Sequence, residues 1–587
     1  MDIEHVERAP AAADRAESSA TAAAAAAAAA AGTATAAAVA TAAIALAACG
    51  GGGSESPSGG DPGTGGGTPP PPAQPTAVEA SRFLAQASMG ANKAQIARVQ
   101  AIGYSAWIDE QFALPQSGGR WEALVAGGYD AAINKNSETG FDPAAWRKLL
   151  ASPDTLRQRV TLALCEIMVT SIDSLVGGGW KAFAAANYLD LLEANAFGNY
   201  RTLMQQVSTN TAMGMYLTFR GSKKANPASG SLPDENYARE LMQLFTIGLV
   251  QLNLDGTAKL TGGATTPTYT QADITGLAPV FTGWDFDLGG QSGAVATATP
   301  DFIRKPMVQI PGRHETAAAT FLGTTIAANT DAVLALQLAL DAIFAQPNIA
   351  PFVSRQLIQR LVASNPAPAY VARVAAVFNN DGAGVKGNLK AVVKAVLLDA
   401  DARSASIAAA AAAGKLREPM LRFSGWARAW NAQSASNAWS IGNTSDPSTK
   451  LGQSPLRSPS VFNFFRPGYV PPNSAIAAAG LVAPEFQIAN ESSVVGAVNY
   501  LQRAMSGAGV GDLLADYTPL LAIADDSAAL AAEINLVLAA GQLSAATLTT
   551  ISTAVATLPG GSDPNRLKRI YASLTLVVAA PEFVILK

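Results

Sequence analysis

A helical period of apolar residues runs through most of the chain from about residue 78 onward, and it constrains the fold more than any other feature. The period is clearest in residues 231–248, where apolar side chains at spacings of three and four form one stripe along a helix. Ser231 and Asp234 have the form of a capping box, and Gly248 is placed to end the helix. Glu235 and Arg239 are spaced to form an ion pair one helical turn apart. This pattern predicts a helix over residues 232–247.

Similar patterns predict helices along the rest of the chain. Thr270 and Asp273 have the form of a second capping box, and Asn388 is placed to start a helix after a glycine-rich break. The predicted helices span residues 79–88, 92–101, 104–113, 143–150, 153–170, 180–196, 199–207, 232–247, 271–282, 331–345, 349–363, 368–378, 387–399, 415–432 and 565–578.

Strand signals are few. Residues 249–260 alternate around a turn formed by Asp255 and Gly256, which predicts a hairpin, and residues 285–312 can hold another short ribbon. We therefore expect a mainly α fold. It would be one large helical domain over residues 78–587, with one or two short β-hairpins in inserted loops.

The first 48 residues differ in composition from the rest. They are rich in alanine and close on an apolar run that ends in Leu46, two alanines and Cys49. Such a run is typical of a bacterial lipoprotein signal, in which the thiol of Cys49 receives the lipid. The Gly-, Ser- and Pro-rich residues 49–77 then read as a tether. The alternatives are a weak transmembrane helix or a low-complexity alanine tract.

This signal predicts an exported protein of the cell envelope, held at a membrane through Cys49. Gly50 rather than Asp follows the cysteine, which in a Gram-negative envelope favours the outer membrane, with the protein facing the periplasm or the surface. The first 48 residues carry 2 of the 40 Lys and Arg and 5 of the 44 Asp and Glu, so the remainder has 38 against 39, a net charge of −1. A nearly neutral body argues against nucleic acid as a partner.

Several ordered runs carry a family resemblance. They are Glu-Asn-Tyr-Ala-Arg-Glu-Leu-Met at residues 235–242, Tyr-Thr-Gln-Ala-Asp at 269–273, Phe-Thr-Gly-Trp at 281–284, Gly-Lys-Leu-Arg-Glu-Pro at 414–419 and Ser-Pro-Ser-Val-Phe-Asn-Phe-Phe-Arg-Pro at 458–467. Together they closely resemble the bacterial family known as domain of unknown function 1800, over about residues 78–587. The family has no established reaction. It is commonly encoded beside domain of unknown function 1501, which looks like the sulfatase and alkaline phosphatase group, so the resemblance implies a secreted partner of that kind.

The small number of histidines is the strongest constraint on the chemistry of this chain. His5 lies in the predicted signal, which leaves His314 and excludes a multi-histidine metal site within one chain. We expect no metal and no cofactor. His314 precedes Glu315, a pairing that can orient an imidazole as a general base. The competing interpretation is a surface-loop histidine hydrogen-bonded to its neighbour.

Carboxylates offer a second route to chemistry. Glu240 and Asp273 lie on predicted helices that flank the hairpin, and they could converge as an acid/base pair for cleavage of a polysaccharide. Alternatively, Glu240 is a buried carboxylate held by Arg239, Arg355 or Arg417, an ion pair that locks helices together.

Aromatic and arginine side chains interleave on the proline-stiffened loop at residues 451–472. Such a loop can form a platform for sugar rings or a partner surface, or its aromatic rings can simply fix it to the helices. The candidate binding residues are Asn236, Arg239, Trp284, Arg355, Arg417, Phe464, Arg466 and Tyr469.

These observations predict an exported, lipid-anchored envelope protein that binds or assembles an envelope or extracellular polymer, with a polysaccharide as one candidate. The alternative is a hydrolase or lyase that acts on a surface glycan, with Glu240, Asp273 and His314 in its active site.

Overall fold

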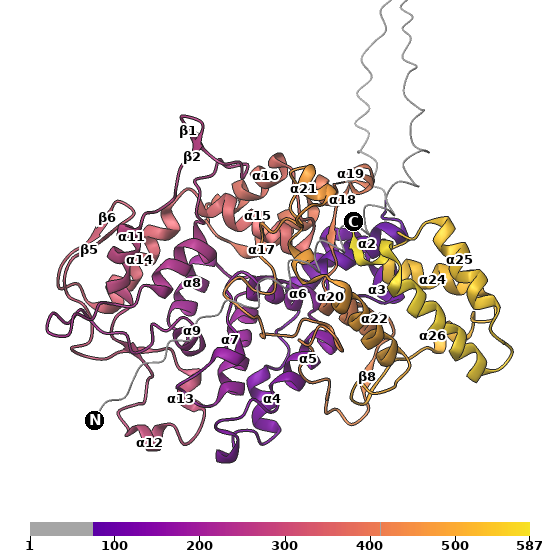
Figure 1. Cartoon of the computed structure of the whole chain (residues 1–587), viewed down its shortest axis with the longest axis horizontal. Coiled ribbons are helices and arrows are strands. Elements are labelled where there is room, and N and C mark those ends of the chain that lie inside the picture. Colours follow the sequence, from indigo (N-terminus) through magenta and orange to yellow (C-terminus); the bar gives the residue numbers. More distant parts are fainter. Residues whose placement is uncertain (1–73, 411) are drawn as a thin grey trace, which may run out of the picture. The chain divides into compact units, whose positions relative to one another are not determined.

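A computed structural model describes residues 74–410 and 412–587 (Figure 1). The predicted signal, Cys49 and the tether up to residue 73 lie outside the described residues. The described part is mainly helical, and its strands pair into five two-stranded antiparallel sheets. The predicted mainly α fold with short hairpins is confirmed.

The elements of the first half of the fold are α2 (Ala77–Ala87), α3 (Lys93–Ala113), α4 (Arg120–Ala126), η1 (Ala132–Asn134), α5 (Phe141–Ala151), α6 (Thr155–Cys165), η2 (Ile172–Ser174), α7 (Lys181–Ala194), α8 (Tyr200–Ser208), α9 (Thr211–Tyr216), α10 (Asn236–Glu240), η3 (Leu241–Thr246), β1 (Leu260–Thr261), β2 (Ala264–Thr265), α11 (Gln271–Leu277), η4 (Ala278–Phe281), β3 (Trp284–Asp285), α12 (Gly293–Ala296), α13 (Asp301–Arg304), β4 (Val308–Gln309), β5 (Ala319–Phe321) and β6 (Thr324–Ile326). The break expected between residues 101 and 104 is a kink inside α3 at Gly103, whose φ is 80°.

The remaining elements are α14 (Ala332–Ala345), α15 (Ile349–Leu361), α16 (Pro368–Asn379), α17 (Leu389–Leu398), α18 (Ala400–Arg403), α19 (Ala405–Ala409), β7 (Lys415–Leu416), α20 (Pro419–Ala429), β8 (Gln433–Ser434), α21 (Ala475–Ala478), η5 (Pro484–Ile488), α22 (Glu491–Met505), β9 (Leu513–Leu514), α23 (Thr518–Leu521), α24 (Ser527–Ala539), α25 (Ala545–Ala556), α26 (Asp563–Ala579), α27 (Pro581–Val584) and β10 (Ile585–Leu586). Among the described residues, no single helix is long and apolar enough to cross a membrane, and only α14 with α15, bent by 77° at their junction, meets that criterion as a pair.

The helix predicted at 232–247 starts later and changes type. Ser231 does not cap it, because its backbone bridges to Asn226 instead, and the helix begins at Asn236. Its second half, η3, is a π-helix, in which the Thr246 hydroxyl donates to the Leu241 carbonyl at 2.6 Å. The predicted pair of Glu235 and Arg239 is confirmed at 3.3 Å. A π-helix is uncommon and frequently marks a functional site.

Both predicted ribbons are found in altered form. The turn at Asp255 and Gly256 closes a single bridge between Leu252 and Ala258, and the chain then folds back again as β1 and β2. The second ribbon pairs β3 with β4. The capping box of Thr270 with Asp273 is confirmed at the start of α11.

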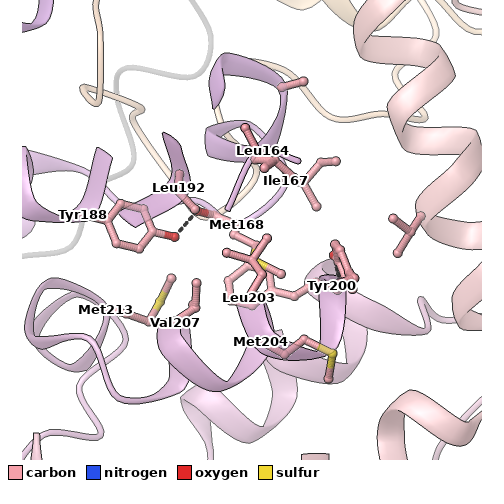
Figure 2. Close-up of a cluster of buried hydrophobic side chains, with 14 of the residues drawn as sticks. Leu164, Ile167, Met168, Tyr188, Leu192, Tyr200, Leu203, Met204, Val207 and Met213 are labelled. Carbon is pink, nitrogen blue, oxygen red and sulfur yellow. Dashed lines mark hydrogen bonds between the residues drawn. The ribbon is translucent and has the colours of Figure 1, made fainter. Parts of the chain in front are cut away.

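Buried apolar side chains form two clusters. The larger cluster extends from α2 to α18, and Figure 2 shows part of it, where the Tyr188 hydroxyl donates to the Met168 carbonyl at 2.5 Å. The second cluster is built mainly from α20, α22, α24 and α26, and from Trp146 of α5, whose ring meets that of Phe423 edge to face. Burial of these side chains supplies the main driving force for folding.

Candidate binding groove

A groove of about 620 Å³ opens in the described part of the chain. Its wall combines apolar and aromatic side chains with glutamine amides, three arginines and one carboxylate. The lining residues include Glu166, Gln243, Leu244, Leu249, Phe352, Arg355, Gln356, Gln359, Arg360, Phe462, Arg466 and Tyr469. This volume is in the range of pockets that hold small ligands or short stretches of a polymer.

One wall of the groove is a single face of α15. Phe352, Arg355, Gln356, Gln359 and Arg360 lie at spacings of three and four, so they project from the same side of the helix. Residues 243–252 form a second wall, which begins in the π-helix η3.

Asn348 joins these two walls at the start of α15. Its side-chain amide donates to the Val250 carbonyl at 3.0 Å and to the Ile247 carbonyl, while its Oδ1 accepts from the Leu252 amide at 2.5 Å. Hydrogen bonds between the Asn348 side chain and main-chain groups of residues 247–252 therefore hold the second wall against α15.

The loop at residues 461–470 closes the groove. Phe465 is buried beneath the Arg360 guanidinium, 4.8 Å from ring centre to Cζ, and Gln359 Nε2 donates to the Pro467 carbonyl at 3.4 Å. The Arg466 guanidinium lies over the Phe462 ring, with 4.7 Å between Cζ and the ring centre. Some aromatic rings of this loop thus fix it to α15, while others face the groove beside Tyr469.

Two of the groove arginines lack an acidic partner among the described residues. Arg355 makes only a 3.5 Å contact from Nη1 to the Gly256 carbonyl, and burial lowers its pKa. Arg466 is exposed. Guanidinium groups stay charged at neutral pH, so both are available to an anionic group that enters the groove.

The floor of the groove holds a buried acid. Glu166 follows directly after α6, its side chain is only 3% exposed, and its Oε2 lies 3.6 Å from Arg360 Nε. Neither Glu166 oxygen accepts a hydrogen bond from the described residues. Burial, with the nearby Glu418 carboxylate, holds the pKa of Glu166 well above its usual range.

Further charges lie behind Glu166, out of reach of solvent. Lys415 Nζ lies 2.9 Å from Glu485 and 3.3 Å from Glu418, and all three side chains are at most 1% exposed. We call Arg159, Glu166, Arg360, Lys415, Glu418 and Glu485 the groove-floor cluster. The sequence run at 414–419 held two of its members, but nothing in that run indicated that they lie behind a groove.

The structure brings together three of the eight predicted binding residues, because Arg355, Arg466 and Tyr469 line the groove. Phe464 lies next to Glu166 in a separate small cavity. Trp284 is buried and donates from its indole nitrogen to the Val280 carbonyl at 3.2 Å.

The other predicted binding residues lie outside the groove lining. Asn236 contacts the Leu217 carbonyl at 3.4 Å, and Arg239 pairs with Glu235. Arg417 is buried beneath Phe583 and donates to the Leu538 carbonyl at 2.7 Å.

The three candidate catalytic residues occupy separate places. Glu240 is 7% exposed; burial raises its pKa, and it forms no ion pair with the described arginines. It is thus buried, as one interpretation expected, but not held by Arg239, Arg355 or Arg417. None of the cavities described here is lined by Glu240 or Asp273.

Asp273 and His314 are engaged by local structure. Burial would raise the pKa of Asp273, but hydrogen bonds from the Leu322 amide and from Thr270 outweigh it, and the pKa is lowered. His314 Nδ1 lies 3.1 Å from the Thr282 carbonyl, and Glu315 accepts hydrogen bonds from backbone amides rather than from the imidazole.

Within the described residues, no group of three or more His, Cys, Asp or Glu side chains is arranged to hold a metal ion. The groove instead offers guanidinium groups, amides and aromatic faces. These groups bind by charge-assisted hydrogen bonds and by stacking on rings.

Fold and groove together define a mainly helical protein with an arginine- and aromatic-lined binding groove. The chain belongs to the family described as "Protein of unknown function (DUF1800)", whose family model matches residues 82–585. Searches of curated proteins and of solved structures found no match.

Proposed function

We propose that the protein is an exported, lipid-anchored component of the cell envelope, and that its groove binds an anionic polysaccharide of the envelope or of the extracellular matrix. The composition of the groove carries this proposal. Arg355 and Arg466, which lack acidic partners among the described residues, share one cavity of about 620 Å³ with glutamine amides and aromatic rings.

Each of these groups matches one part of such a ligand. The apolar faces of sugar rings stack on aromatic side chains, here Phe462 and Tyr469. A uronate or other acidic substituent accepts paired hydrogen bonds from a guanidinium. The raised pKa of Glu166 favours the uncharged form of its carboxyl group, which reduces repulsion of an anionic ligand.

Binding of a uronate oligosaccharide and of a neutral glucan of the same length, measured by calorimetry, tests this proposal. The protein is expected to prefer the uronate. Arg355→Ala and Arg466→Ala should each weaken its binding by about 10- to 100-fold, because hydrogen bonds to charged groups contribute about 1.5–3 kcal/mol.

Arg239→Ala is the matched control, since it removes the same charge from an exposed pair outside the groove. It should leave binding unchanged. Equal affinity for both oligosaccharides, or an equal loss in the control variant, excludes an anion-binding groove.

The lipid anchor belongs to the same proposal and rests on the sequence up to Cys49. Cys49→Ala should move the protein from the membrane fraction to the soluble fraction. Cys165→Ala changes the other of the two cysteines and should leave the protein at the membrane. A secreted partner that resembles domain of unknown function 1501 remains a prediction, to be tested by co-purification.

A hydrolase or lyase acting on a surface glycan is the second candidate, and Glu166 is the observation that favours it. A carboxyl group whose raised pKa favours the protonated form can donate a proton to a leaving sugar oxygen. Both Glu166 oxygens are buried, so this reaction requires the groove floor to open toward the ligand. If the protein cleaves the polymer, new chain ends should form, and Glu166→Gln should abolish them. Cleavage that survives Glu166→Gln but is lost in Glu240→Gln would instead support the residues predicted from the sequence.

A further inference from the structure

A second cavity, of about 570 Å³, shares no lining residue with the groove. Its wall includes three cationic side chains, Lys135, Arg220 and Arg313, and a single carboxylate, Asp285. The lining therefore carries a formal excess of two positive charges.

Asp285, which is already counted in this excess, is shared between the two arginines. Asp285 Oδ1 lies 2.9 Å from Arg220 Nη1, and its Oδ2 lies 3.0 Å from Arg313 Nη1. Lys135 has no acidic partner among the described residues, and its Nζ donates to the Thr297 hydroxyl at 2.9 Å. Asp285 thus orients two guanidinium groups while leaving most of their N–H donors free.

The cavity wall is held in position by packing. The Arg220 guanidinium lies 4.2 Å over the Phe286 ring, and its Nη2 donates to the Gly177 carbonyl at 3.3 Å. This fixed orientation reduces the conformational entropy that Arg220 would lose on binding a ligand.

Glycines at residues 177–179 bring the backbone close to this wall. A Cβ atom on Gly178 would lie 2.6 Å from Met215 Sδ and 2.9 Å from Phe286 Cζ, so a side chain there would force Met215 or Phe286 to move. Gly177 and Gly179 have φ values of 81° and 68°, which other residues rarely adopt. The backbone conformation of this segment therefore favours glycine.

We propose that this cavity binds a dianionic oxyanion group, of the kind carried by a phosphate monoester. The N–H groups of Arg220 and Arg313 that do not bind Asp285 or Gly177, together with the Lys135 ammonium group, can donate to the oxygens of a phosphate group. The excess of two positive charges matches the charge of the dianion. This inference does not depend on the groove or on its proposed ligand.

Calorimetry of the purified full chain with inorganic phosphate, glycerol phosphate and a phosphate diester tests the proposal. Phosphate and the monoester should bind, and the diester, with a single charge, should bind at least tenfold more weakly. Affinity for the monoester should fall as the pH drops below about 6, where the second phosphate pKa lies.

Arg313→Ala and Lys135→Ala should each weaken phosphate binding at least tenfold. Arg220 then still pairs with Asp285, so the thermal melting curve should stay unchanged. Arg304→Ala, at an exposed pair with Glu122 outside this cavity, is the matched control and should bind phosphate as the parent chain does. If either variant is unstable, Arg313→Gln and Lys135→Met serve in its place. Absence of phosphate binding, equal binding of the diester, or unchanged binding in both variants overturns the proposal.

Discussion

Two clusters of buried charges in this protein differ in how closely their glutamate is paired with cationic side chains. In the closed cluster, formed by Arg120, Lys148, Asp190 and Glu193, both Glu193 oxygens are paired at 2.7 Å, one with Arg120 and one with Lys148. In the groove-floor cluster, Glu166 lies 3.6 Å from Arg360 and accepts no hydrogen bond from the described residues.

The effect on the two acids is opposite. Burial would raise the pKa of Glu193, but Arg120 and Lys148 outweigh burial and lower it. Burial and Glu418 raise the pKa of Glu166 instead. A buried carboxylate with two close cationic partners is a structural element. Glu166 differs, because its raised pKa favours the uncharged form and its side chain borders the groove.

The largest effect should come from breaking the closed cluster. Glu193→Ala leaves Arg120 and Lys148 buried without their shared partner, and we expect a loss of about 3–5 kcal/mol in the free energy of unfolding, measured with urea. The exposed Glu122, paired with Arg304, is the control, and Glu122→Ala should cost at most about 1 kcal/mol. Equal losses in the two variants would show that burial does not distinguish the pairs.

A smaller, pH-dependent effect should follow from Glu166→Gln. A raised folded-state pKa means that the native protein keeps the proton after the unfolded chain has released it, so the parent loses stability as pH rises above about 4.5. The variant cannot titrate there. As pH rises above about 4.5, the free energy of unfolding of the variant should therefore increase relative to that of the parent, by up to about 1.4 kcal/mol per pH unit.

Glu418 interacts with Glu166 through a hydrogen bond between the two side chains, and a glutamine at position 166 can still donate that bond. Burial would raise the pKa of Glu418, but Lys415 and other partners hold it at about 2. Its contribution is present above the unfolded-state value and is lost as pH falls toward 2, outside the window in which Glu166 acts. A constant stability difference between parent and Glu166→Gln from pH 4.5 to 8 would contradict the raised pKa of Glu166.

Arg355→Met tests whether an arginine of the groove contributes to the stability of the fold or to ligand binding. Removing a partly buried charge that has no acidic partner among the described residues relieves its desolvation, so we expect the free energy of unfolding to stay level or rise by up to about 1 kcal/mol. The same change should weaken oligosaccharide binding. A large loss of stability, measured by thermal melting, would assign Arg355 to the framework of the protein.

The smallest effect is expected at the exposed helical pair. Arg239→Ala removes the contact with Glu235 and should change the free energy of unfolding by about 0.5 kcal/mol or less. A loss well above that value in urea unfolding would show that Arg239 also supports the neighbouring π-helix.

Local patterns predicted many of the helices and missed others. The period in α15 and the capping box of α11 are properties of adjacent residues, and both are found where expected. The helices α22, α24 and α25 were not predicted. The Ala-, Ser- and Thr-rich α24 and α25 carry a weak amphipathic signal, and packing within the second cluster decides their structure. In contrast, α22 has a clear apolar stripe and a capping box of Asn490 with Ser493, so local patterns could have found it.

The candidate site also contains residues that the sequence predicted and residues that only the packing of the helices revealed. Arg355, Arg466 and Tyr469 were predicted as binding residues from the sequence, and the structure places all three in the lining of the groove. Glu166 was not, because nothing within a few residues of it indicates that Arg360 and Lys415, about 200 or more positions away, surround it. Such charge partners are brought together only when the helices pack.

The sequence alone determined the mainly helical fold, the positions of several helix starts and the kinship of the chain, because each of these depends on neighbouring residues or on ordered motifs. Only the tertiary structure decided that α15, the π-helix and the loop at 461–470 line one groove. It also decided that Glu193 is hydrogen-bonded to two cations, whereas Glu166 accepts no hydrogen bond from the described residues. Desolvation and the distance between charges set the behaviour of those acids, and both quantities arise from packing between segments far apart in the chain.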